Sequence, residues 1–382
     1  MSKWPSHQLG ELAVVVMGQS PPGDTYNAEG HGLPFFQGKA EFSEQHPRVV
    51  KWCDAPLRIA EPGDVLLSVR APVGPTNVAR ERCCIGRGLA AIRPRRSGLS
   101  ASFLTYYFKA YESQITQQGV GSTFGAIGRA VIESLSVPLP PLPEQDRIVR
   151  ILDEAEALRR LREEAEKRSQ GLARTLFVEG FGDPRTNPSK WLTGVLGDVI
   201  HSAQDGPHVS PKYSEAGIPF LSTRNVRAGQ IIWDDLKYIS ASEAELHWRK
   251  CKPLRGDILY TKGGTTGLAK AVDFDTEVAV WVHIAVLKTD RETVDPVWLE
   301  SMLNTEYCHA QSQELTHGIA NRDLGLTRMV NISIYIPPIG LQRDFAARVA
   351  EIRALQGAQG ASRKRLDDLF QSLLHRAFAG EL

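Results

Sequence analysis

The sequence predicts an α+β protein in which two similar domains are joined by two long helices, paired as an antiparallel coiled coil with pseudo-two-fold symmetry. Two observations predict this class. A globular stretch leads twice through a proline-rich exit into a long amphipathic helix, first as PLPPLPEQDRIVRILD from Pro138 and again as YIPPIGLQRDFAARVAEI from Tyr335. The upstream landmarks GDVLL at Gly63 and GDILY at Gly256 recur in the same order. Such a duplication makes one chain a pseudo-dimer with two similar but non-identical surfaces.

Each domain is predicted to combine short strands with one longer helix. Apolar β-rich runs bounded by glycine and proline indicate strands. In the first domain, residues 1–142, we expect strands at Val14–Val16, Val65–Val69, Ala90–Ile92 and Val131–Pro138, and a helix at Ser102–Gln117. In the second domain, residues 183–339, we expect strands at Pro219–Leu221, Ile258–Thr261, Val278–Leu287 and Val330–Ile336, and a helix at Pro296–Gln313.

The two long helices are predicted at residues 143–182 and 340–382. Apolar residues recur there at helical spacing, in the first helix at Ile151, Ala155, Leu158, Leu161 and Ala165, and in the second at Phe345, Val349, Ile352, Leu355, Leu366, Leu369 and Leu373. A helix of about 35 residues extends about 50 Å, too long for burial in one domain. We therefore expect the stripes to pair with each other and to set the spacing between the domains. The alternative is that each helix packs separately on its own domain.

Glycine and proline positions predict where these helices begin, end and bend. Pro143 suits the first turn of a helix, where its missing N–H has no cost. The first helix is expected to end at the breakers Gly180, Gly182 and Pro184. Gly357 and Gly360 lie inside the second helix, and glycine is unfavourable there, so we expect a kink in the second helix.

The composition predicts a cytoplasmic protein without a membrane segment. The 382 residues are 42% hydrophobic and 23% charged, as is ordinary for proteins with buried cores. The early apolar run Leu12–Met17 is too short to cross a bilayer and follows no basic signal-peptide head. The five cysteines include no C-x-x-C pair, so we expect free thiols in a reducing compartment and no structural zinc.

The net charge of +1 neither favours nor excludes a nucleic-acid partner, so a DNA-binding surface would need local segregation of charge. Such segregation occurs between residues 249 and 270, where Asp257 is the only acid. The basic residues of this stretch are Arg249, Lys250, Lys252, Arg255, Lys262 and Lys270. They predict either a binding face or an ordinary solvated basic face.

Motifs of catalysis are incomplete. Gly86-Arg87-Gly88 is a weak match to a dinucleotide turn, because no βαβ unit surrounds it. The glycine-rich segment 263–267 lacks the Gly-Lys-Ser/Thr order of a phosphate-binding loop. Asn187-Pro188-Ser189-Lys190 falls short of the Asn/Asp-Pro-Pro-aromatic motif of amino-methyltransferases, and the histidines are scattered. We therefore expect a non-enzymatic chain without a metal or cofactor of its own.

Loops in both domains combine glycine with hydroxyl, amide and basic side chains. Glycine lets backbone N–H groups approach a phosphate, while Arg, Lys, Asn and Gln can read base edges in the major groove. These loops are residues 205–208, 222–225, 262–266 and 317–322 in the second domain, and 19–20, 37–39, 68–70 and 121–124 in the first. Their recurrence at equivalent places predicts two DNA-binding surfaces.

The segment PLPPLPEQDRIVRILDEAEALRRLREEAEKRSQGLARTLFVEGFGDP, residues 138–184, resembles the central conserved region of the specificity (S) subunit of Type I restriction–modification systems. DGPHVSPKYSEAGIPFLSTRNV at 205–226 and GDILYTKGGTTGLAKAV at 256–272 resemble stretches of that family's target-recognition domains. The resemblance spans both halves and both helices. The second junction differs, since Leu341-Gln342-Arg343 stands where Pro-Glu-Gln is usual.

The resemblance implies a non-catalytic DNA-binding subunit whose two domains each read half of a bipartite target in double-stranded DNA. It implies partners as well: two methyltransferase (M) subunits carrying S-adenosylmethionine, docked along Ile148–Leu176 and the other helix, and restriction (R) subunits using ATP. The implied DNA contacts are Lys262, Gly264, Thr265, Thr266, Arg224, Asn225, Asp205 and His208, and in the first domain Arg70, Lys39, Gln37, Ser122 and Thr123. The alternative is a protein–protein scaffold with two ligand-binding domains.

Overall fold

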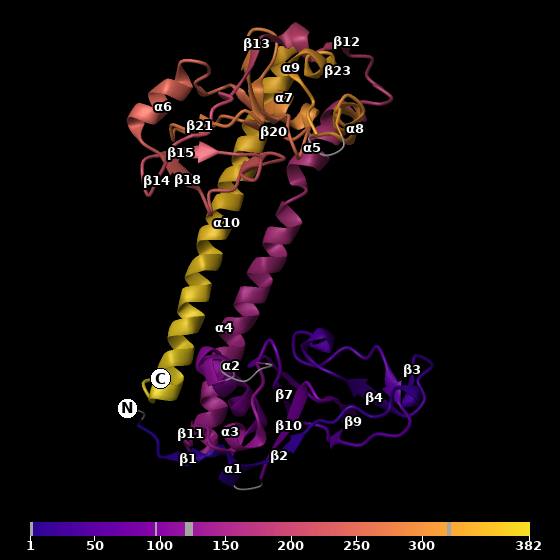
Figure 1. The fold of residues 1–382 in the computed structure, drawn as a ribbon, viewed down its shortest axis with the longest axis vertical. Coiled ribbons are helices and arrows are strands. Elements are labelled where there is room, and N and C mark those ends of the chain that lie inside the picture. The colour runs from indigo at the N-terminus through magenta and orange to yellow at the C-terminus, as the bar shows by residue number, and fades with distance from the viewer. Residues whose placement is uncertain (1–2, 96–97, 119–124, 319–321) are drawn as a thin grey trace. The chain divides into compact units, whose positions relative to one another are not determined.

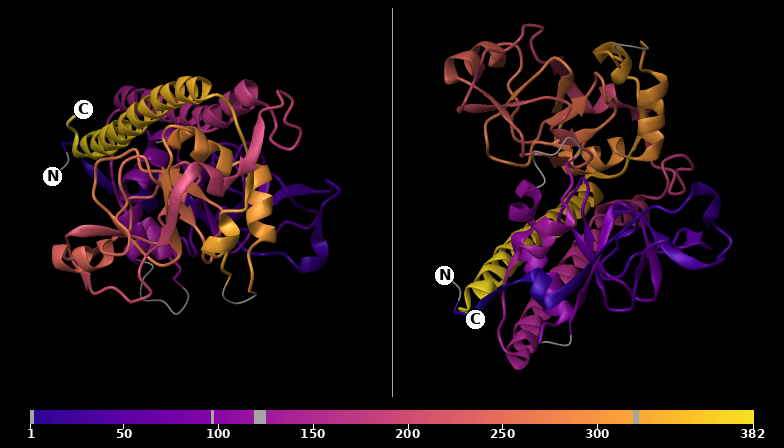
Figure 2. Two further views of the ribbon diagram at one scale, coloured as in Figure 1. Left: turned by 90° about the horizontal axis from the view of Figure 1, so that it is seen from above. Right: turned by 60° about the horizontal axis from the view of Figure 1, so that its bottom comes forward.

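The computed structural model describes residues 3–95, 98–118, 125–318 and 322–382, which form two compact units (Figures 1 and 2). Unit 1 contains Met1–Glu164 and Gly360–Leu382, and unit 2 contains Ala165–Gln359. Each unit therefore holds one domain, the beginning of one long helix and the end of the other. The predicted α+β class, with two similar domains and two long helices, is confirmed.

The two domains share the order of their main elements, and the second adds α6. The first contains β1 (Ser6–Gln8), α1 (Leu9–Leu12), β2 (Ala13–Met17), β3 (Tyr26–Asn27), β4 (Leu33–Phe36), β5 (Trp52–Cys53), β6 (Ile59–Ala60), β7 (Val65–Ser68), β8 (Thr76–Val78), β9 (Cys83–Ile85), β10 (Leu89–Pro94), α2 (Ala101–Gln118), α3 (Arg129–Glu133) and β11 (Ser136–Pro138). The long helix α4 (Leu142–Ser169) and the shorter α5 (Leu172–Phe181) follow.

The second domain contains β12 (Leu192–Val195), β13 (Ile200–Asp205), β14 (Tyr213–Ser214), β15 (Ile218–Leu221), β16 (Val226–Arg227), β17 (Gln230–Ile231), β18 (Lys237–Ile239), α6 (Ala241–Trp248), β19 (Ile258–Thr261), β20 (Ala269–Ala271), β21 (Ala279–Val280), β22 (Ile284–Thr289), α7 (Pro296–Leu303), α8 (Glu306–Glu314), α9 (Leu326–Met329) and β23 (Ser333–Ile336). The chain then continues as α10 (Ile339–Ala379). None of the described helices is long and apolar enough to cross a membrane.

A four-stranded antiparallel sheet lies at the centre of each domain, in the order β2-β10-β7-β8 in unit 1 and β13-β22-β19-β20 in unit 2. Both faces of this sheet are covered, which explains why its central strands are almost continuously apolar. In β7, Val65 and Leu67 join the core formed with the helices, while Leu66 joins the core on the opposite face. In unit 2, Tyr260 and Leu259 divide between two cores in the same way.

A second sheet of short strands accompanies each central one and contains one parallel pair of strands. Its order is β3-β5-β4-β9-β6 in unit 1 and β14-β18-β15-β21 in unit 2. The parallel pairs are β4 with β9 and β15 with β21. The pairs β1–β11 and β12–β23 join the start of each domain to its last strand, directly before the proline exit.

The two long helices pair antiparallel within each unit. In unit 1, Arg159 of α4 forms an ion pair with Asp367 of α10 at 2.6 Å. Nearer the start of α4, Arg147 donates to the carbonyl of Leu382, which follows the end of α10, at 2.6 Å. In unit 2, the ring of Phe177 contacts that of Phe345, with centroids 5.8 Å apart. The alternative of separately packed helices is thereby wrong for the described parts of both units.

The apolar stripe predicted for the first helix is wrong beyond Ala155. Ile148, Leu152 and Ala155 are buried, but Leu158 and Leu161 are 53% and 63% exposed. The helix pairs there through polar side chains instead. Periodicity alone cannot distinguish a leucine that faces the other helix from one that faces solvent or a partner.

The helix break lies in the first helix, whereas the sequence predicted it in the second. α10 runs unbroken through Gly357 and Gly360, and the first helix is interrupted at Gln170–Gly171 between α4 and α5. The Gln356 amide donates to the Ser169 carbonyl at 2.8 Å, and the Ser169 hydroxyl donates to Gln359 at 3.0 Å. A side chain of the facing helix thus satisfies the carbonyl that a continuous helix would bond internally, which stabilises the break.

Four predicted elements are shorter than expected or divided in two. The predicted strand Val131–Pro138 is α3 followed by β11, and Val330–Ile336 contains only β23. The predicted strand Val278–Leu287 is β21 and β22, separated by a turn. The predicted helix Pro296–Gln313 is α7 and α8, because the Thr305 hydroxyl accepts from the Cys308 N–H and starts a new helix.

One buried glutamine fixes the start of each long helix. The side chain of Gln145 accepts from the Ser100 N–H at 2.8 Å and donates to the carbonyls of Gly98 and Pro140 at 2.6 and 2.8 Å. It thereby joins α4 both to the proline exit and to the chain just before α2.

The equivalent side chain in unit 2, Gln342, makes the same three bonds. It accepts from the Asp295 N–H at 2.9 Å and donates to the carbonyls of Thr293 and Pro337 at 3.3 and 2.7 Å. Both glutamines are fully buried. The altered Leu341-Gln342-Arg343 junction therefore retains the one side chain of the motif that the fold uses.

Replacing Gln145 or Gln342 by alanine is expected to destabilise the corresponding unit by about 1–3 kcal/mol, because a buried N–H and two buried carbonyls lose their partner. Denaturant unfolding followed by circular dichroism measures the change. Gln371→Ala, an exposed position on α10, is the matched control and should unfold like the unmodified protein. Equal stability of all three variants would contradict the assigned role.

Candidate functional site

In unit 2, the structure places the predicted contact residues at neighbouring strand ends. Asp205 ends β13, Lys262 follows β19, and Arg224 and Asn225 follow β15. Asp205 and Lys262 meet directly, with their carboxylate and ammonium 3.4 Å apart. His208 lies next to them, its Nε2 3.6 Å from the Asp205 carboxylate. The sequence prediction thus selected residues that the fold brings to one edge.

Asp205 and Lys262 are the buried members of a charge cluster. The Asp205 carboxylate also accepts from Lys250 at 2.5 Å, and Lys262 donates to Asp323 at 2.8 Å. Burial is the largest influence on the Asp205 carboxyl and raises its pKa, but hydrogen bonds and charge from Lys250 and Lys262 outweigh it, so the pKa lies below the usual 3.8. The Asp205 carboxyl is therefore ionised at pH 7.

The glycine-rich turn after Lys262 is held in place by the segment that contains Asp323. The Gly264 N–H donates to the Arg322 carbonyl at 3.0 Å, and the Leu324 N–H donates to the Lys262 carbonyl at 2.7 Å. Gly264 has a φ of 68° and no neighbour near its Cα hydrogens, so glycine is needed for conformation rather than for space. Gly264 and Thr265 are exposed.

Two predicted contact residues use their polar groups within the fold. The Thr266 hydroxyl accepts from the Gln313 amide at 3.2 Å, and Thr266 is 2% exposed. The Asn225 side-chain oxygen accepts from the Ser222 N–H at 3.0 Å, and its amide donates to the Ile232 carbonyl at 3.3 Å. These two side chains shape the loops. Arg224 is exposed beside Asn225.

Arg224 lines a pocket of about 330 Å³ next to the turn. The pocket also contains Trp281 and His283, whose carbonyl accepts from the Lys262 N–H at 2.9 Å, so the pocket and the turn are continuous. Its further lining residues are Tyr213, Phe220, Ser222, Thr223, Asn225, Ile232, Asp234, Asp235 and Lys237. The sequence did not point to Trp281 or Lys237, because the parallel pairing of β15 with β21 brings Trp281 to the pocket and the antiparallel pairing of β15 with β18 brings Lys237 there.

In unit 1, Gln37, Lys39 and Arg70 are exposed on loops that meet at Gly88. The Gly88 N–H donates to the Gln37 carbonyl at 3.1 Å, and the Gly88 carbonyl accepts from the Val69 N–H at 2.9 Å. Backbone hydrogen bonds hold these loops together, as the bond from the Lys262 N–H to the His283 carbonyl does in unit 2. Ser122 and Thr123 lie outside the described residues. Contact of any of these residues with DNA stays a prediction.

The basic stretch between residues 249 and 270 does not form a purely basic face. Most of its cations pair with acids from other parts of unit 2, at 2.5 to 2.8 Å: Lys250 with Asp205, Lys252 with Glu277, Arg255 with Asp275, Lys262 with Asp323 and Lys270 with Asp273. Charge that is segregated along the sequence is thus neutralised in space.

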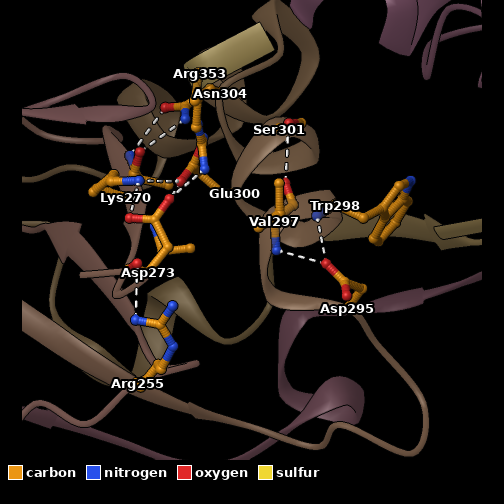
Figure 3. Close-up of polar contacts among 12 residues, drawn as sticks. Arg255, Lys270, Asp273, Asp295, Val297, Trp298, Glu300, Ser301, Asn304 and Arg353 are labelled. Carbon is orange, nitrogen blue, oxygen red and sulfur yellow. Dashed lines mark hydrogen bonds and ion pairs between the residues drawn. The ribbon is translucent and has the colours of Figure 1, made fainter. Parts of the chain in front are cut away.

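A buried ion network joins α10 to the second domain (Figure 3). Glu300 of α7 is 2% exposed, accepts from the Ala271 N–H at 2.7 Å, and forms ion pairs with Lys270 and with Arg353 of α10. Arg353 also pairs with Asp273 at 2.6 Å. Every charge in this network is matched, so its role is to fix the helix rather than to bind a ligand. Among the described residues, no group of histidine, cysteine and acid side chains could hold a metal ion.

Comparison with known proteins shows which proteins the chain is similar to. The family model described as the Type I restriction modification DNA specificity domain matches residues 1–168. A protein of Methanocaldococcus jannaschii, provisionally named as the type I restriction enzyme MjaX specificity subunit, is 42% identical over 181 residues. That alignment covers 46% of this chain and 43% of the relative, so it spans less than half of either protein.

Two further similarities extend over more of the chain. The type I restriction enzyme EcoKI specificity subunit of Escherichia coli is 24% identical over 336 residues, covering 78% of this chain and 69% of that protein. A crystal structure of a Type-I restriction-modification system S subunit from M. genitalium aligns over 99% of this chain and 96% of that one, with a TM-score of 0.59 and 14% identity. Residues 1–168 thus match the family model of the Type I specificity domain, and the chain is similar to Type I restriction enzyme specificity subunits over most of its length.

The acid–base behaviour of Asp205 gives a test of the charge cluster. Because its pKa is lower in the folded state, Asp205 contributes stability above about pH 3.8, and this contribution is lost as the pH falls through the folded-state pKa. Asp205→Asn should therefore destabilise unit 2 by about 1–2 kcal/mol at pH 7. The difference from the unmodified protein should narrow below pH 4 in denaturant unfolding.

Asp275→Asn is the control, since Asp275 is 95% exposed and pairs with Arg255 only at the surface. It should change stability little at any pH. A pH-independent difference between Asp205→Asn and the unmodified protein would show that Asp205 stabilises the fold without its charge.

Proposed function

We propose that this chain is the DNA-specificity subunit of a Type I restriction–modification complex and that each unit reads one half of a bipartite target in double-stranded DNA. The observation that carries the proposal is the repeated backbone frame at one edge of each central sheet. In unit 1 it carries the exposed Gln37, Lys39 and Arg70, and in unit 2 it carries Arg224 and the turn after Lys262. Arginine, lysine and amide side chains on rigidly held loops are the groups that contact phosphates and base edges.

The two surfaces are built on one frame but carry different side chains, as expected for two domains that read different sequences. His208, Gly264 and Thr265 are exposed in unit 2 and belong to this proposed contact surface. Below these exposed residues, four buried side chains help to shape the loops: Asp205, Asn225, Lys262 and Thr266. The frame gives each surface a rigid backbone, so specificity resides in the few side chains that differ.

We further propose that the chain is non-catalytic and assembles with two M subunits, which hold S-adenosylmethionine and methylate adenine, and with R subunits that use ATP. The exposed leucines of the long helices support a protein partner there. Leu158, Leu161 and Leu369 are 53%, 63% and 48% exposed in unit 1, and Leu355 is 52% exposed in unit 2. Apolar side chains so exposed on a paired helix are typical of a subunit interface.

Deleting this chain from its host should abolish adenine methylation at one split DNA motif, because the M subunits would lose their sequence specificity. Single-molecule sequencing of genomic DNA, with and without the chain, measures the methylated positions. Restoring the chain on a plasmid should restore the same motif. A methylation pattern that is unchanged by deletion would contradict the proposal.

Exchanging residues 1–142 for the corresponding domain of a related specificity subunit should change one half of the methylated motif and leave the other half and the spacer unchanged. The same sequencing experiment measures this in cells that carry the chimaera. The reciprocal exchange of residues 183–339 is the matched control and should change only the other half. A change in both halves from one exchange would rule out independent reading.

A further inference from the structure

The two recognition surfaces differ at one pair of equivalent positions below the loops. Asp205 is the β13 residue that pairs with Ala285 in the register of the central sheet, and Met17 is the β2 residue that pairs with Ala90 at the same point. The position of Lys262 in unit 2 is occupied by Val69 in unit 1. An ion pair in one unit thus replaces an apolar pair in the other.

Backbone hydrogen bonds establish that Val69 and Lys262 are equivalent. The Val69 N–H donates to Gly88 and its carbonyl accepts from Ile127, at 2.9 and 3.0 Å. The Lys262 N–H donates to His283 and its carbonyl accepts from Leu324, at 2.9 and 2.7 Å. Because Val69 is apolar and 2% exposed, this position in the frame does not require a cation to fold.

Lys262 is poorly placed to contact DNA itself. Its side chain is 7% exposed, and its ammonium lies between the carboxylates of Asp205 and Asp323. A cation that is already paired with two acids and shielded from solvent releases few counterions when DNA binds. Its strongest contact, 2.8 Å to Asp323, instead reaches the segment that carries Arg322.

Asp323 holds this segment against the glycine-rich turn. It forms an antiparallel bridge with Gly263, and its N–H and carbonyl exchange hydrogen bonds with His317 at 2.9 and 3.0 Å. Its carboxylate is 46% exposed, so the ion pair with the buried Lys262 fixes a side chain that would otherwise face solvent. The segment is thus held by backbone hydrogen bonds and, through the Asp323 side chain, by the charge of Lys262.

Arg322, next to Asp323, is exposed and carries the charge that faces outwards. Its guanidinium donates to the neutral side-chain oxygen of Gln313 at 2.6 Å, and no ion pair with it occurs among the described residues. An unneutralised guanidinium beside exposed glycine and threonine has the donors to bind a phosphate or a guanine edge. Both ligands belong to the same duplex.

We infer that Arg322 is a DNA-contacting residue of the second recognition surface and that Lys262 is a positioning residue, which places Arg322 through its ion pair with Asp323. The inference rests on the proposed function, because it assigns roles within the surface that reads the second half of the target. It divides the cluster into a buried part that orders the loop and an exposed part that meets the nucleic acid.

The test measures DNA binding by the complete complex with its methyltransferase subunits, at several salt concentrations, to a duplex containing the methylated motif and to one without it. Three forms are compared with the unmodified complex. Arg322→Gln removes the proposed contact. Lys262→Met together with Asp323→Asn removes the positioning ion pair without changing the net charge. Arg185→Gln is the control, since Arg185 is an exposed arginine of the same unit already paired with Asp183 and Glu306.

Arg322→Gln should make the plot of log affinity against log salt shallower by about 1 if it contacts a phosphate, or reduce the preference for the motif by about 10-fold if it contacts a base. The charge-neutral pair should keep the slope but lower the preference for the motif, because Arg322 is retained and misplaced. Arg185→Gln should match the unmodified complex in both measurements.

Two results would overturn the inference. One is an Arg322→Gln complex that behaves like the Arg185→Gln complex, and the other is a shallower salt slope for the charge-neutral pair, which would place Lys262 on the DNA. If the proposed function itself is wrong, the unmodified complex will show no preference for the motif, which distinguishes that outcome from the two results above. A double variant, Lys262→Val with Asp205→Met, places the two apolar residues of unit 1 at these positions. It should still unfold cooperatively, which would show that unit 2 folds without the ion pair.

Discussion

The buried glutamine at the start of each long helix is the contact on which the rest of each unit depends. A helix that leaves a domain through prolines has few backbone donors with which to fix its direction, because each proline lacks an N–H. The amides of Gln145 and Gln342 supply them, each bonding the proline exit and the chain before the domain's own helix. Loops, sheet and helix then move as one body, so a surface on the loops keeps a defined orientation to the helix.

Much of this architecture was predictable, because duplication repeats its signals. The central strands, the proline exits and the long helices all follow from local apolar patterns and breakers. The position of the helix break was not predictable, because it depends on a partner that is distant in sequence. Gly171 at the break and Gly357 inside α10 have the same low helix propensity, yet only the first helix is interrupted, where the Gln356 amide bonds the Ser169 carbonyl. Propensities of about 1 kcal/mol do not decide against such a contact.

The location of the candidate site could be predicted from the sequence, but the role of each residue in it could not. Loop composition selected residues that lie at one sheet edge, because glycine and polar residues cluster where strands end. It could not separate exposed Arg224 from Asn225 and Thr266, whose polar groups are used within the fold. Nor could it show that Lys262 meets acids from elsewhere in the chain. Trp281 was missed because a parallel strand pair, invisible in local sequence, brings it to the pocket.

The side chains through which the two long helices form ion pairs with their domains carry opposite charges. Eleven residues after the buried glutamine, α4 carries Glu156, bonded to Lys109 of α2 at 2.5 Å, and α10 carries Arg353, bonded to Glu300 of α7. A duplicated chain risks folding with its homologous parts exchanged. An exchange would bring Arg353 near the helix that carries Lys109 and Glu156 near the helix that carries the buried Glu300, and repulsion between like charges is unfavourable where solvent is partly excluded. The two ion pairs therefore favour the packing of each long helix against its own domain.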